Sequence, residues 1–204
     1  MKSVQTFTGT DQHDIINTTM IGQALLLAAA IALTSAQSFS FGGCPSATTQ
    51  QSFDLSQYLG IWYELYRFPT SYEKGQRCIT ANYTLQANNH IYVHNEGFDP
   101  KTGKPSIAIG DAYQNDPQNS PSKLKIRFAA HTPYGNYWVL KTDYTSYTLI
   151  YSCIDILGLS HLEQAWIMSR ERSLPQAKID ELMDVFKSFK IDTNHFLKAD
   201  QAGC

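Results

Sequence analysis

The sequence has little of several features that mark common classes of protein. Its 16 lysine and arginine residues are balanced by 18 aspartate and glutamate residues, so the net charge is only −2. Without a positive surplus to neutralise phosphates, we expect no nucleic-acid partner. There is no Gly-x-Ser-x-Gly turn of the kind that carries the nucleophile of many serine hydrolases, and no Cys-x-x-Cys pair of the kind that binds structural zinc. Hydrophobic residues nevertheless make up 43% of the chain, which argues against global disorder.

Long apolar runs are also scarce. The strongest, Ala24–Leu33, is too short to cross a bilayer, because a membrane helix needs about 20 residues. Small residues follow it and end at Ala36, a pattern that a signal peptidase recognises. We therefore predict that residues 1–36 are a secretory leader, with Met20 as a possible alternative start, and that residues 37–204 are a single secreted domain. The alternative is that the apolar run is a buried core helix.

Cysteines are few, but their number is even. All four lie behind the predicted leader: Cys44, Cys78, Cys153 and Cys204. This pattern predicts two disulfide bonds, and the spacing leaves all three pairings open. His90 and His94 lie four residues apart on one expected strand, but no third ligand accompanies them, so we expect no metal site.

Aromatic residues, in contrast, are abundant, with 12 tyrosines, 10 phenylalanines and 3 tryptophans. Many of them fall in segments where apolar and polar residues alternate, which is the period of a half-buried strand. We predict eight such strands: 61–68, 77–86, 90–97, 105–113, 122–129, 136–141, 146–153 and 163–170. Short turns separate them, which favours an antiparallel meander. Closure into a barrel would remove its exposed edges and leave an interior able to hold one small ligand.

One helix is expected after the last strand. It begins near Pro175, whose missing N–H costs nothing in the first turn. Its apolar residues recur at helical spacing and fall on one face: Ile179, Leu182, Met183, Phe186 and Phe189. This face should pack on the outside of the sheet.

Three short motifs resemble the signatures of the lipocalin family, in the family's order. Gly60-Ile61-Trp62 is similar to the first, Thr142-Asp143-Tyr144 to the second and Arg170 to the third. The stretches Tyr58–Glu64 and Cys78–Tyr83 are especially similar to apolipoprotein D-like lipocalins, a group that includes insect bilin-binding proteins and related pigment carriers. The resemblance covers about residues 37–204.

The resemblance implies an all-β fold, an eight-stranded antiparallel up-and-down barrel with one C-terminal helix packed outside. It implies the pairs Cys44–Cys153 and Cys78–Cys204, and structural roles for six signature residues: Gly60, Trp62, Thr142, Asp143, Tyr144 and Arg170. It further implies a secreted carrier for a fatty acid, sterol, retinoid or pigment, with no required cofactor and no enzymatic activity. The alternatives are a bilin- or carotenoid-binding colour protein, and an enzyme of the lipocalin type, which would need a free thiol in the cavity.

Strand alternation extends these expectations to the cavity. In the family, Trp62 points inward at the closed end and Arg170 packs across it, so neighbours two residues apart share that face. The predicted ligand contacts are Tyr83, Val93, Asn95, Phe128, Tyr137, Val139, Trp166 and Met168. Asn82 then points outward and opens the sequon Asn82-Tyr83-Thr84, a predicted glycosylation site. The alternative is that these side chains fill the barrel and leave no cavity.

The segment 154–162 is unusually apolar for a link between two strands. In this fold it would lie at the rim of the open end. We expect it either to touch a membrane or a lipoprotein particle during ligand transfer, or to pack against the loop around Tyr72.

Overall fold

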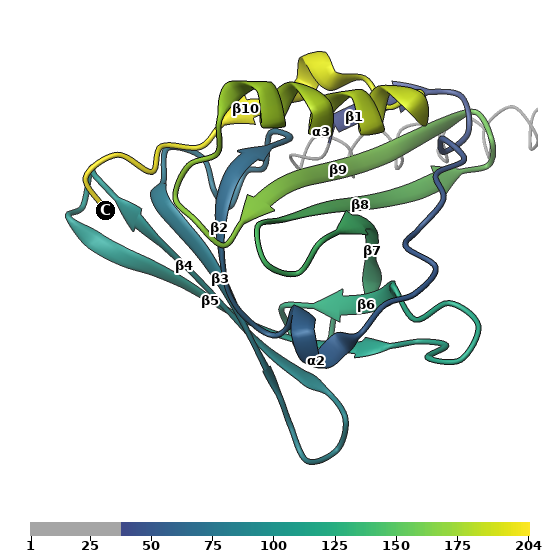
Figure 1. Cartoon of the computed structure of the whole chain (residues 1–204), viewed down its shortest axis with the longest axis horizontal. Coiled ribbons are helices and arrows are strands. Elements are labelled where there is room, and N and C mark those ends of the chain that lie inside the picture. Colours follow the sequence, from purple (N-terminus) through teal and green to yellow (C-terminus); the bar gives the residue numbers. More distant parts are fainter. Residues whose placement is uncertain (1–37) are drawn as a thin grey trace, which may run out of the picture. The chain divides into compact units, whose positions relative to one another are not determined.

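The computed structural model describes residues 38–204, and they form one antiparallel sheet that closes on itself (Figure 1). Its strands are β1 (Ser38–Phe41), β2 (Gly60–Arg67), β3 (Arg77–Leu85), β4 (Ile91–Asp99), β5 (Lys104–Gln114), β6 (Lys123–Arg127), β7 (Gly135–Thr142), β8 (Tyr147–Ile156), β9 (Ser160–Ser169) and β10 (Leu197–Lys198). The helices are α2 (Leu55–Tyr58), α3 (Gln176–Ser188) and the short 3-10 helix η1 (Thr193–His195). Among these residues, no helix is long and apolar enough to cross a membrane.

Strands β2 to β9 build the barrel. Each pairs with the next one along the chain, and β9 returns to pair with β2, for example through Arg67 and Trp166. The predicted eight-stranded antiparallel barrel is therefore confirmed, with strand ends that differ from the predicted ones by a few residues. Strands β1 and β10 were not predicted. Strand β1 pairs with the start of β9, and β10 pairs with the end of β2. The predicted leader lies outside the described residues.

Helix α3 packs against the outside of the barrel, as predicted (Figure 1). Its apolar face buries Ile179, Leu182 and Phe186 completely or nearly so. These side chains contact the outward-facing residues of β8 and β9, among them Tyr151 and Ile167. Each fully buried side chain of this size contributes roughly 1.5–3 kcal/mol. A second apolar cluster fills the part of the barrel interior next to α2.

Two disulfide bonds hold the ends of the described chain to the barrel. Cys44 is bonded to Cys153 in β8, and Cys78 in β3 is bonded to the C-terminal Cys204. This is the pairing that the family resemblance implied. The backbone N–H of Cys78 also donates to the carbonyl of Asp200 at 2.8 Å, so the C-terminal tail is fixed along the barrel wall.

One end of the barrel is closed by α2 and the start of β2. Asp54 caps α2 by accepting hydrogen bonds from the backbone N–H groups of Ser56 and Gln57. Gly60 follows with a φ of +90°, a backbone conformation that favours glycine. The chain can then turn so that Trp62 enters the barrel, where it is fully buried.

The other signature residues stabilise the same end. The carboxylate of Asp143 accepts from the backbone N–H groups of Ser146 and Tyr147, which fixes the turn between β7 and β8. The hydroxyl of Thr142 donates to the carbonyl of Tyr147 at 2.7 Å. Tyr144 reaches across to the segment before α2, where its hydroxyl donates to the carbonyl of Ser52. These contacts hold together the closed end of the barrel.

Candidate ligand-binding cavity

A cavity of about 710 Å³ occupies the barrel at the end opposite α2. Its walls come from β2 to β9, and its mouth is formed by the loops after β2 and β6 and by the end of β8. Much of the lining is aliphatic, from Ile79, Ala81, Ala108, Ile126, Ile150 and Ile154. Ligand sites in proteins are concave, mostly apolar and carry a few polar groups, which is the character of this cavity.

Six of the eight side chains predicted as ligand contacts line this cavity: Tyr83, Asn95, Phe128, Tyr137, Trp166 and Met168. Phe128 lies one residue beyond the end of β6 and is 44% exposed at the mouth. Val93 and Val139 also face into the barrel, but they are fully buried in the same packed cluster as Trp62 and line no cavity wall. Alternation places a residue inside the barrel but does not say how deep it lies.

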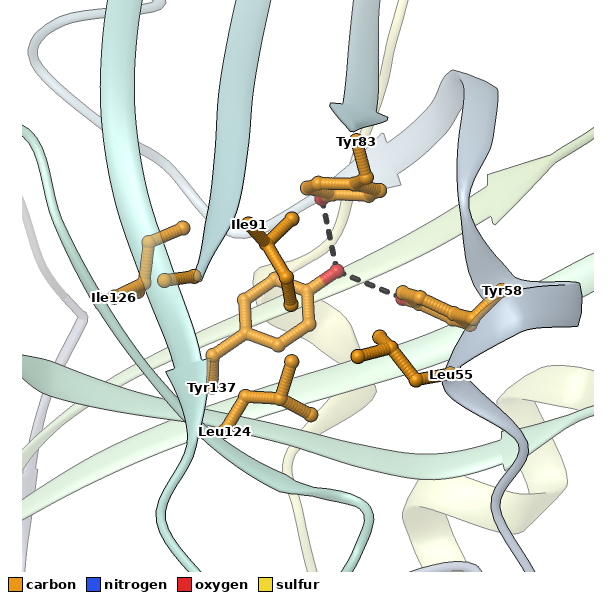
Figure 2. A pocket seen from close by; sticks show the side chains of 8 residues that line it. Leu55, Tyr58, Tyr83, Ile91, Leu124, Ile126 and Tyr137 are labelled. Carbon is orange, nitrogen blue, oxygen red and sulfur yellow. Dashed lines mark hydrogen bonds between the residues drawn. The ribbon is translucent and has the colours of Figure 1, made fainter. Parts of the chain in front are cut away.

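Three tyrosines form a hydrogen-bonded layer at the floor of the cavity (Figure 2), and two of them, Tyr83 and Tyr137, line the cavity itself. The hydroxyl of Tyr137 lies 2.7 Å from that of Tyr58 and 2.9 Å from that of Tyr83. Burial raises the pKa of Tyr58 to about 12 and raises the pKa values of Tyr83 and Tyr137 as well, so all three remain neutral phenols. Beneath them is a void of about 10 Å³, lined with apolar residues such as Leu55, Ile91 and Leu124.

Tyr58 was not among the predicted site residues. It belongs to α2, before the first barrel strand, so strand alternation could not place it. Its hydroxyl also lies 3.2 Å from that of Thr148, which connects α2 to β8. The floor is thus a hydrogen-bonded layer between the base of the barrel and the cavity.

A buried charged group on one wall was also missed. Arg67 donates from Nη1 to Oε1 of Glu64 at 2.8 Å, and its Nε lies 3.5 Å from Oε2 of Glu73. Thr70 donates to the same oxygen of Glu73 at 2.7 Å. Glu64, Arg67 and Glu73 are all at least nine-tenths buried, and we call them the Glu64–Arg67–Glu73 group. Glu64 follows Trp62 by two residues, so alternation from Trp62 would have placed it inside.

The two carboxyl groups do not ionise in the ordinary range. Burial, and then the neighbouring Glu73, raises the pKa of Glu64 from its usual 4.5 to about 8, although Arg67 opposes the shift. Burial likewise raises the pKa of Glu73. One arginine therefore shares its charge between two carboxyl groups, and Glu64 keeps its proton near neutral pH.

His90 and the four cysteines, considered above as metal ligands or as a reactive thiol, contact other groups. His90 pairs with Asp111 through Nδ1 at 2.9 Å, whereas His94 lies on the outward face of β4. In residues 38–204, no group of three or more His, Cys, Asp or Glu side chains is arranged to hold a metal ion. All four cysteines are in disulfide bonds.

The apolar segment 154–162 is shorter as a loop than expected. Strand β8 continues to Ile156 and β9 begins at Ser160, because the two strands pair almost to the tip of the hairpin. Leu157 and Leu159 are 90% and 73% exposed at that tip. Phe41 in β1 pairs with Ser160 and is also exposed, which widens the apolar surface.

Comparison with known proteins agrees with this architecture. The model of the Lipocalin-like domain family matches residues 53–201. Apolipoprotein D of Cavia porcellus is 41% identical over 179 residues, which cover 88% of this chain and 93% of that protein. The structure of insecticyanin from the tobacco hornworm Manduca sexta is similar with a TM-score of 0.70 at 26% identity, and covers 82% of this chain and 90% of that one. Apocrustacyanin C1 also gives a TM-score of 0.70, at 25% identity, over 81% of this chain and 92% of its own. The chain therefore belongs to the lipocalin family and is similar to apolipoprotein D.

Proposed function

We propose that the protein is a secreted carrier that holds a small hydrophobic molecule, such as a fatty acid, sterol, retinoid or pigment, in its barrel. The observation that supports this most directly is the cavity of about 710 Å³ with its largely apolar lining. Burial of roughly 250 Å² of apolar ligand surface would give a gross ~6 kcal/mol, enough for micromolar binding after the costs of association. The proposed ligand contacts are Tyr83, Asn95, Phe128, Tyr137, Trp166 and Met168.

Secretion is part of this proposal. The apolar run that ends at Ala36 has the form of a leader. Two disulfide bonds support an oxidising compartment, because cytosolic proteins rarely keep them. Asn82 is partly exposed within its sequon, on the outward face of β3, which suits a glycosylated residue.

A pigment is the second candidate ligand. The sequence resembles insect bilin-binding proteins, and the fold is similar to insecticyanin. A bilin or carotenoid would give a visible absorption band, whereas a saturated lipid or sterol would not. Enzymatic activity of the kind that needs a cavity thiol is disfavoured by the pairing of all four cysteines.

Contact with a membrane or lipoprotein particle is proposed for the hairpin tip. Leu157 and Leu159 are exposed beside the cavity mouth, where a ligand would enter or leave. In a liposome flotation assay, Leu157→Asp should reduce the bound fraction. Leu85→Asp is a matched control, because Leu85 is 45% exposed at the opposite end of the barrel. Equal flotation of Leu157→Asp and the parent would end this part of the proposal.

The carrier function is tested by purifying the full chain from a secreting eukaryotic cell and extracting it with organic solvent. We expect a single class of lipophile in near-equimolar amount by mass spectrometry, and the absorption spectrum separates pigment from colourless lipid. A preparation that contains no lipophile and binds none of a panel of retinol, cholesterol, oleate and biliverdin would refute the proposal.

A further inference from the structure

The outer face of β4 and β5 carries exposed apolar side chains. Tyr92 and Phe98 of β4 and Ile107 and Ile109 of β5 all point outward, and their exposed fractions run from 37% for Phe98 to 56% for Ile107. The pairing of the two strands makes Tyr92 a diagonal neighbour of Ile109, and Phe98 a diagonal neighbour of Ile107. Diagonal neighbours lie within reach of aromatic side chains, at roughly 7–8 Å. We call these four residues the outer apolar patch.

No element of residues 38–204 buries the outer apolar patch. Helix α3 packs over the apolar cluster that contains Tyr151 and Ile167, and no residue of β4 or β5 belongs to that cluster. The C-terminal tail runs past the start of β3, where the carbonyl of Asp200 accepts from Cys78. A contiguous apolar surface on a soluble protein favours association, so this face calls for a partner or a cover.

The sequon at Asn82 lies on the same outer face. Asn82 of β3 is opposite His94 of β4, and His94 is opposite Ile109 of β5, so the three side chains form one row across the sheet. Two strand spacings separate Asn82 from Ile109, which is about 10 Å. Tyr92 is nearer, because it is opposite Thr84 and is therefore the diagonal neighbour of Asn82. A glycan attached to Asn82 would begin at the border of the outer apolar patch.

We propose that an N-glycan on Asn82 covers the outer apolar patch and prevents two copies of the protein from associating through it. This inference rests on the proposed secretion and glycosylation, and it gives the glycan a specific role. An N-glycan is bulky and solubilising, so it hinders the close approach of a second sheet. Without it, the patches of two copies would be buried against each other in a two-fold contact, in which each copy offers the same surface.

The test compares glycosylated and unglycosylated forms of the full chain, secreted from a eukaryotic cell. Size-exclusion chromatography with light scattering gives the polypeptide mass over a series of protein concentrations. The parent should stay monomeric, whereas Asn82→Gln should rise with concentration toward twice the monomer mass. Thr84→Ala should behave like Asn82→Gln, because it destroys the sequon and keeps the asparagine. Thr84→Ser is the matched control, since Asn-Tyr-Ser is still a sequon and the protein should stay monomeric.

Second substitutions in the Asn82→Gln protein locate the contact. Ile109→Lys should restore the monomer, whereas Leu159→Lys, at the exposed hairpin tip, should not. If the variants are not secreted, enzymatic removal of the glycan from the folded parent gives the same comparison. Peptide mapping that finds Asn82 unmodified in the parent would refute both the proposed glycosylation and this inference. If Asn82 is glycosylated, a form without the glycan that stays monomeric, or an association that Ile109→Lys does not reverse, would overturn the inference alone.

Discussion

The guanidinium carbon of Arg170 lies 3.7 Å from the centroid of the Trp62 ring. The same guanidinium donates to the backbone carbonyls of Gln57, Leu59 and Ile61, at 3.0, 2.8 and 2.6 Å. One side chain from the end of β9 thereby holds α2 and the start of β2 in place. The base of the barrel depends on this contact, since these carbonyls would otherwise lose their donors.

Arg170→Lys should therefore weaken the fold despite keeping the charge. A lysine offers one ammonium group in place of the planar fork, so several carbonyls lose their donor. We expect the free energy of unfolding to fall by about 2–4 kcal/mol in urea titrations. Arg172→Lys is the control, because Arg172 only covers the ring of Tyr63 and donates to Gln201. Similar losses in the two variants would contradict the special role of Arg170.

Tyr137→Phe should destabilise the cavity floor more than Tyr83→Phe does. Removal of the central hydroxyl takes a partner from both Tyr58 and Tyr83, whereas Tyr83→Phe leaves the contact between Tyr58 and Tyr137 intact. The expected cost of Tyr137→Phe is about 1–3 kcal/mol, measured by thermal or urea unfolding. The reverse order of stability would show that the hydroxyl layer is not centred on Tyr137.

The stability of the protein should fall as pH rises from about 5 to above 8. Glu64 has a pKa of about 8 in the folded state, against an ordinary 4.5, so the folded state binds more protons in this window. The pKa of the neighbouring Glu73 is raised as well, and Arg67 limits both shifts. Urea titrations at pH 5, 6.5 and 8 should show a steeper decline for the parent than for Glu64→Gln. Parallel profiles would mean that Glu64 does not retain its proton on folding.

Trp166 should report on an occupied cavity. It lines the wall, whereas Trp138 packs with the cluster beneath α3, outside the barrel interior. Bromine quenches indole fluorescence at short range, so 11-bromoundecanol should quench the parent and Trp138→Phe. It should have little effect on Trp166→Phe. Persistent quenching in Trp166→Phe would place the ligand elsewhere.

Much of the barrel could be predicted because hydrophobic alternation has the period of a strand. Counting back from Arg170 places Met168 and Trp166 correctly on the inner face, and Tyr83 and Tyr137, each expected to face inward, do so as well. The count fails in β2, where the pairing with β9 shifts between Glu64 and Tyr66. This bulge adds a residue, so Arg67 faces inward in place of Tyr66. No pattern of residue types indicates a bulge, so the sequence could not identify Arg67 as the partner of Glu64.

The outer strands illustrate a second limit. Ser38–Phe41 alternates like a strand, but Phe39 and Phe41 are exposed and bury nothing that would identify the partner strand. Depth along the barrel is a third limit, since it separated Val93 and Val139 from the residues of the cavity. The partner of an outer strand and the depth of a residue along the barrel both depend on how the strands are staggered. Pairings between residues far apart in the sequence determine that stagger.

The sealed floor also has a kinetic consequence. Trp62 and the tyrosine layer block the base in the part of the chain that the structure describes, so entry and exit share the mouth. A molecule that fills the barrel must leave before its successor can arrive. The rate of replacement should therefore be first order in the loaded protein and independent of the concentration of the incoming molecule. Delivery would then be timed by the residence of the cargo and not by competition from other lipophiles.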